Sequence, residues 1–63
     1  MNDFKQRLET ERVQLEERLN KLDAFLLSEK VNEIDPVQKS LLNIQSSAMN
    51  TYLKCLDERL SRL

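Results

Sequence analysis

The sequence contains no histidine, no glycine and no tryptophan, and it has one cysteine and one proline in 63 residues. The missing histidine removes the commonest general base of enzymes and a usual zinc ligand. The missing glycine removes the loops that bind phosphate in P-loop and dinucleotide-binding proteins. One cysteine cannot form a disulfide within the chain, and we expect no bound metal and no cofactor. These absences predict that the protein is not an enzyme.

Neither sign of charge dominates. Ten Lys and Arg residues face eleven Asp and Glu residues, which gives a net charge of -1. Proteins that bind duplex nucleic acid usually present a clearly basic face, so we expect no duplex nucleic acid partner. No apolar run approaches the ~18 residues of a membrane span, and the first residues do not resemble a signal peptide. The sequence therefore predicts a cytoplasmic protein without a membrane segment.

What the sequence does contain is leucine at helical spacing. The single proline, Pro36, follows Asp35, a good helix N-cap, and proline suits the first turn of a helix. We expect one helix over about 2–32, a turn over about 32–35 and a second helix over about 36–62. Two long helices joined by a short turn should fold back on each other. The predicted fold is all-α, a single antiparallel helical hairpin over residues 1–63.

The second predicted helix has two apolar stripes. The Val37 stripe, expected to face the first helix, consists of Val37, Leu41, Ile44, Ala48, Tyr52 and Cys55. The Leu56 stripe, expected to face outward, consists of Leu42, Met49, Leu53, Leu56, Leu60 and Leu63. On this assignment Cys55 is a small core residue. Alternatively, the two stripes form one broad surface over a single seam.

So short a hairpin is marginally stable alone, and a contiguous exposed apolar surface usually marks an interface. We therefore expect the chain to form a homo-oligomer, an assembled helical bundle. Its predicted interface residues are Leu42, Met49, Leu53, Leu56 and Leu60.

One cluster of residues suits ligand binding. In an antiparallel hairpin the start of the first helix meets the end of the second, where basic and aromatic residues gather. One arginine guanidinium can donate two parallel hydrogen bonds to the oxygens of a phosphate, and aromatic rings stack on nucleotide bases. The alternative is that these residues form ordinary ion pairs at the edge of the bundle. The candidate ligand-binding residues are Phe4, Lys5, Arg7, Tyr52 and Arg59.

The joint spacing of several residues resembles a family of very short phage and prophage proteins, including those of crAss-like phages. The resemblance covers essentially the whole chain and implies a small helical hairpin. It rests on the opening residues 2–8 and on Glu11, Leu15, Leu19, Leu22, Phe25, Leu41, Leu42, Gln45, Ala48, Met49, Tyr52, Leu56 and Arg59.

More remotely, residues 44–49 are similar to a segment in the hairpin domain of phage anti-CBASS and anti-Thoeris sponges. The chain keeps Gln45 and Met49 of that segment but has Ser47 for its glycine and Ala48 for its phenylalanine. Those sponges are small helical oligomers, several of them hexamers, that hold cyclic nucleotide or cyclic ADP-ribose-type immune signals without cleaving them. The resemblance implies a counter-defence protein in the cytoplasm of an infected bacterium, with a cyclic nucleotide ligand.

A second hypothesis stays open. A structural or adaptor coiled-coil module would use the outward apolar stripe to bind a host or phage protein instead of a nucleotide.

Overall fold

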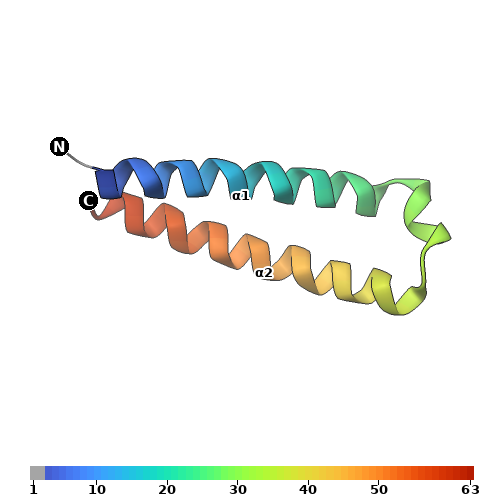
Figure 1. The fold of residues 1–63 in the computed structure, drawn as a ribbon. Coiled ribbons are helices and arrows are strands. Elements are labelled where there is room, and N and C mark those ends of the chain that lie inside the picture. The colour runs from blue at the N-terminus through green and yellow to red at the C-terminus, as the bar shows by residue number, and fades with distance from the viewer. Residues whose placement is uncertain (1–2) are drawn as a thin grey trace.

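The computed structural model describes residues 3–63 and shows two long helices lying side by side in opposite directions (Figure 1). Helix α1 spans Asp3–Leu27, a short 3-10 helix η1 spans Glu29–Glu33, and helix α2 spans Pro36–Ser61. The hairpin is 48 Å long and 14 by 13 Å across. Both ends of the chain lie at the same end of the rod (Figure 1). The all-α antiparallel hairpin predicted from the sequence is confirmed; its predicted start at residue 2 lies outside the described residues.

The first helix ends earlier than the sequence predicts, at residue 27 instead of about 32. Ser28 takes an extended conformation, with φ -86° and ψ 161°. Its backbone N–H and its hydroxyl both donate to the Phe25 carbonyl, at 3.0 and 2.7 Å. These local bonds replace the next helical turn, since a serine hydroxyl competes with helical bonding. The tighter 3-10 turn that follows brings Val31 into the interior, where it is buried.

The second helix begins where the sequence predicts. Asp35 is the N-cap, and its side-chain oxygen accepts a hydrogen bond of 2.9 Å from the Val37 backbone N–H. Pro36 occupies the first turn, where a missing N–H costs nothing because it would have no helical partner. Residue types at the turn thus fix where α2 starts.

The core is a narrow leucine seam between the helices. Leu8 and Leu15 of α1 and Leu56 of α2 form one buried cluster, and Leu56 has no exposed surface. Three more apolar residues of α2 pack against this cluster and are partly buried: Met49, Leu53 and Leu60. Burial of this seam supplies most of the apolar stabilisation available to a single chain.

The two stripes of α2 therefore exchange the places that the sequence predicts. The Leu56 stripe, with its five predicted interface residues, faces α1 from Leu42 to Leu60, and those residues are buried or partly buried within one chain. The Val37 stripe faces solvent instead. Ile44 is 65% exposed, and Cys55, expected in the core, is exposed. Four of the large apolar side chains that the described chain exposes belong to the Val37 stripe: Val37, Leu41, Ile44 and Tyr52.

Polar contacts along one edge of the seam accompany this rotation of α2. Arg12 Nε donates to Asp57 Oδ1, and Ser46 Oγ donates to Asp23 Oδ1 at 2.6 Å. We call this edge the Arg12 side. Both contacts join α1 to α2, and each needs its α2 residue beside the Leu56 stripe. Turning α2 to bury the Val37 stripe would separate both pairs.

The leucine seam leads to the first test. Leu56→Ala should lower the free energy of unfolding by about 2–5 kcal/mol, because it leaves a cavity at the one fully buried position among residues 3–63. Leu27→Ala is the matched control, since Leu27 is 89% exposed and should change stability little. Urea unfolding followed by circular dichroism measures both. Equal losses in the two variants would contradict the assigned core.

The cap of α2 leads to a second test. Asp35→Ala should cost about 1 kcal/mol, because the Val37 N–H loses its acceptor. Asp35→Asn keeps a capping oxygen and should retain most of the stability. Thermal unfolding of the two variants measures the difference. A similar loss in both would show that the charge of Asp35, and not the cap, carries the effect.

Candidate functional site

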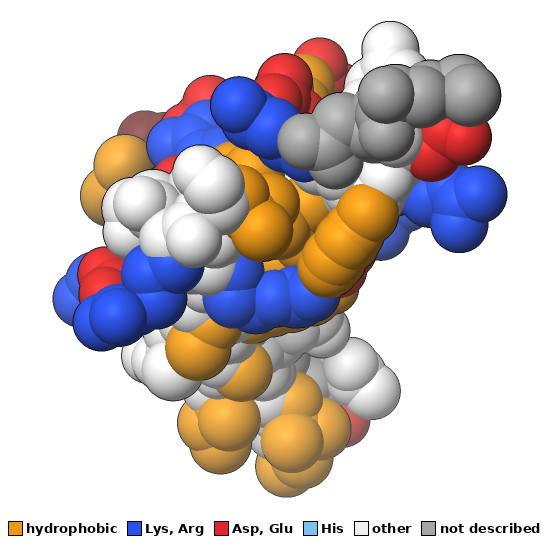
Figure 2. Space-filling view, turned by 90° about the vertical axis from the view of Figure 1, so that its left-hand side faces the viewer, with side chains coloured by type: hydrophobic (Ala, Val, Ile, Leu, Met, Phe, Trp, Pro, Cys, Tyr) orange, Lys and Arg blue, Asp and Glu red, His pale blue; other side chains and the backbone are white. Residues whose placement is uncertain are grey.

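The free end of the hairpin, where α1 begins and α2 ends, gathers exposed basic and apolar side chains. Viewed from this end, Lys and Arg side chains flank an apolar centre, and most acidic side chains lie toward the edge (Figure 2). The beginning of α1 favours negative charge, but the end of α2 lies beside it and favours positive charge, so the two helix dipoles largely cancel and the basic side chains supply the donors. The end thus offers both a surface for stacking and donors for an anion.

An aromatic–cation pair lies at this end. The Arg59 guanidinium carbon lies 5.8 Å from the centre of the Phe4 ring, within the range of a cation–π contact. Phe4 is nevertheless 51% exposed, so half of its surface stays accessible. The pair joins the two helices across the seam and brings together two of the predicted ligand residues.

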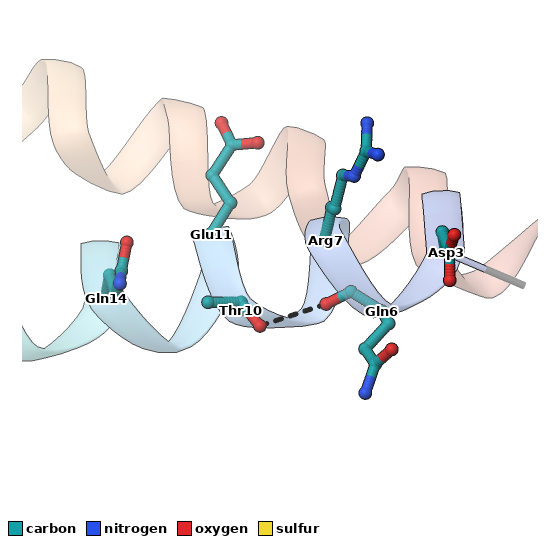
Figure 3. Close-up of a pocket in the computed structure, with 6 residues that line it drawn as sticks. All are labelled: Asp3, Gln6, Arg7, Thr10, Glu11 and Gln14. Atoms are coloured by element: carbon teal, nitrogen blue, oxygen red, sulfur yellow. Dashed lines mark hydrogen bonds between the residues drawn. The ribbon is translucent and has the colours of Figure 1, made fainter.

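Arg7 lies one turn after Phe4 on α1. It lines an open depression on the helix surface with Asp3, Gln6, Thr10, Glu11 and Gln14 (Figure 3). Thr10 Oγ1 donates to the Gln6 carbonyl at 3.0 Å, so this hydroxyl is already used. Within residues 3–63 Arg7 makes no hydrogen bond or ion pair, although Glu11 extends in a similar direction (Figure 3). Its guanidinium can therefore receive an anion.

Tyr52 lies on the same side of α2 as Arg59 but seven residues before it. Seven residues are two helical turns, about 10 Å along the axis. The ring is 43% exposed and belongs to the Val37 stripe. A ligand that touches both Phe4 and Tyr52 must therefore extend over two turns.

Lys5 lies elsewhere around α1. It precedes Arg12 by seven residues and so falls on the Arg12 side, about 200° around the helix from Arg7. The structure thus places Phe4, Arg7 and Arg59 on one side of the free end, with Tyr52 two turns away on the same side of the hairpin, and leaves Lys5 on the other side. Arg62, also near this end, pairs with Glu58 at 2.8 Å.

The Arg12 side holds the chain together and offers little to a ligand. Arg12 contacts two carboxylates, Asp57 across the seam and Glu16 at 3.3 Å on its own helix. The hydrogen bond with Asp57 raises the pKa of the Arg12 guanidinium, so its charge is held firmly. Because both acids neutralise it, this cation has a structural role.

The described surface of one chain gives a ligand no enclosed site at the free end. The depression around Arg7 and its neighbour around Val13 are both lined by α1 alone and open to solvent. Residues 3–63 contain no group of three or more side chains suited to a metal ion. Among the same residues, no helix is long and apolar enough to cross a membrane.

The sequence profile of the Sequestin family matches residues 2–62. The chain belongs to the Sequestin family. No curated protein and no solved structure matches it. The family name is consistent with a protein that sequesters a molecule, and the match spans both helices and the turn between them.

The pair at the free end of this Sequestin-family hairpin can be tested by a double-mutant cycle. Phe4→Leu and Arg59→Met each remove one partner, and their coupling energy should be about 0.5–1 kcal/mol, typical of an exposed cation–π contact. Urea unfolding of the four proteins gives this value. Additive effects would show that the two side chains are merely neighbours.

Proposed function

We propose that the protein is a phage-encoded counter-defence protein that holds a nucleotide immune signal, of the cyclic oligonucleotide or cyclic ADP-ribose type, without cleaving it. It acts as a homo-oligomer in the cytoplasm of the infected cell. The proposal combines membership of the Sequestin family with the residues at the free end.

One observation supports a nucleotide as the ligand. An accessible aromatic ring, Phe4, lies against one guanidinium, Arg59, and one turn from a second that has no ion pair within residues 3–63, Arg7. An aromatic face suits a base, and two guanidinium groups suit phosphate oxygens. A nucleotide presents both a planar ring and negative charge within so short a distance.

The open geometry supports an oligomer. Small-molecule sites usually bury most of the ligand surface, whereas the free end of one chain exposes it on several sides. A second chain beside this end would cover the ligand and remove water, and both effects strengthen charged contacts. Capture by occupancy then needs no bond to be broken, in keeping with a sequence that has no histidine.

Calorimetry with cyclic dinucleotides, cyclic trinucleotides and cyclic ADP-ribose isomers tests the proposal. We expect tight binding of one ligand class, and recovery of that ligand unchanged after heat denaturation of the protein. Arg7→Ala and Arg59→Ala should each weaken binding by about tenfold or more, since each removes a charge-assisted hydrogen bond donor.

Lys30→Ala is the matched control. It also removes one positive charge, but it lies in η1 at the turn end of the rod. Circular dichroism should show the same helicity in all three variants. The proposal would be overturned if both arginine variants bind the ligand as tightly as the unmodified protein, or if no ligand of the set gives measurable binding.

The exposed Val37 stripe favours a second candidate, an adaptor that binds another protein. Charge-poor apolar helix faces are typical of such contacts. This candidate predicts that the ligand panel gives no signal at all.

A further inference from the structure

The free face of α2 is apolar over about five turns. Val37, Leu41 and Ile44 are each more than half exposed, and Ala48, Tyr52 and Cys55 continue the same stripe. These residues recur at intervals of three and four, so they form one continuous ridge. Orange side chains are visible on the far part of the rod in Figure 2. A ridge of this length is larger than scattered surface apolar residues explain.

Charge is missing from the same part of the chain. Residues 40–53 contain no Asp, Glu, Lys or Arg, although 33% of all residues are charged. Helix α1, in contrast, carries charged residues along its whole length. The flanks of the Val37 stripe are Ser40, Gln45, Ser47 and Thr51. Depletion of charge is the compositional mark of the centre of a protein interface.

The stripe is complementary to itself when two copies run in opposite directions. With the two-fold axis passing between Ile44 and Ala48, Ile44 lies opposite the partner's Ala48. In the same register Val37 lies opposite the partner's Cys55, and Leu41 lies close to the partner's Tyr52. Each pair matches a larger side chain with a smaller one or fills the space beside a ring, as good core packing requires. A parallel pair would set Ala48 against itself and leave a gap there.

The hairpin also needs this surface to be covered. Its seam buries few side chains, and among residues 3–63 only Leu56 is fully enclosed. A standard interface removes about 800 Å² per partner. That is roughly a sixth of the 5065 Å² that one chain exposes, and the Val37 stripe is the long apolar surface available for it. A second copy supplies it without any charge left unpaired on the ridge.

We infer that two copies of this chain pair through the Val37 stripe of α2, antiparallel, about a two-fold axis between Ile44 and Ala48. The inference rests on the homo-oligomer of the proposed function and names the surface that forms it. In this pair the beginning of the partner's α2 lies beside residues 55 and 56. Each free end is therefore flanked by the other copy, and the two ligand sites lie at opposite ends.

Disulfide trapping tests the register. The variant Val37→Cys has a new thiol opposite the partner's Cys55, so mild oxidation should convert most of the protein to a covalent dimer. In the unmodified protein the two Cys55 residues are about 27 Å apart along the helices, because eighteen residues separate positions 37 and 55. A disulfide needs Cβ atoms about 4 Å apart. The unmodified protein should therefore form no covalent dimer.

Lys39→Cys is the matched control, since position 39 lies at the same level of α2 on the opposite face. It should remain uncrosslinked. Covalent dimers of the unmodified protein would indicate parallel pairing and overturn the inference, as would equal crosslinking of the Lys39→Cys variant.

Analytical ultracentrifugation of the unmodified protein gives an answer that does not depend on any variant. A single species of 7.5 kDa at micromolar concentration would overturn the inference. Neither measurement uses a ligand, so the pairing and the nucleotide hypothesis can fail separately.

Discussion

Two helices packed side by side can shelter only one strip of each from water, and in this hairpin that strip is the leucine seam around Leu56. The other features follow from it. At the turn, α1 ends early and Val31 of η1 is buried, and the Arg12 side closes one edge of the seam with contacts between the helices. Because so little apolar surface fits between two helices, the second ridge of α2 is left in solvent. Because the seam cannot bury both stripes of α2, the Val37 stripe stays exposed and available for contact with another chain.

The same constraint shapes the free end. Antiparallel packing brings the beginning of α1 against the end of α2, and with the Leu56 stripe turned toward α1 this sets Phe4 beside Arg59. A rod only about 14 Å across cannot wrap around a nucleotide, so the site is open. A second chain would therefore both stabilise the hairpin and enclose the ligand. In the antiparallel pair that we infer, one contact along α2 supplies both.

Much of the candidate site was predictable because it depends on sequence position and hairpin geometry. The hairpin geometry predicts that Phe4 and Arg59 lie at the same end of the rod, whereas their contact also depends on which face of α2 is turned toward α1. The helical period also predicts that Arg7 and Lys5 lie on different sides of α1. The contacts of Arg12 then show that Lys5 is on the side where the two helices are joined by polar contacts. The separation of Tyr52 from the end by two turns follows from its number. The openness of the site also follows from the predicted fold, because a hairpin of two helices is too small to surround a ligand.

By itself the sequence determined two helices, a turn at Asp35 and Pro36, and a hairpin whose ends meet. Helix-forming residues, a capping carboxylate and a proline act locally, so their effects do not depend on the rest of the fold. The tertiary structure decided which stripe of α2 faces α1. Both stripes are apolar and have the helical period, so the period alone does not distinguish them. With the Leu56 stripe inward, leucine and methionine side chains fill the seam in place of the smaller Ala48 and Cys55, and Asp57 and Ser46 also reach their partners on α1.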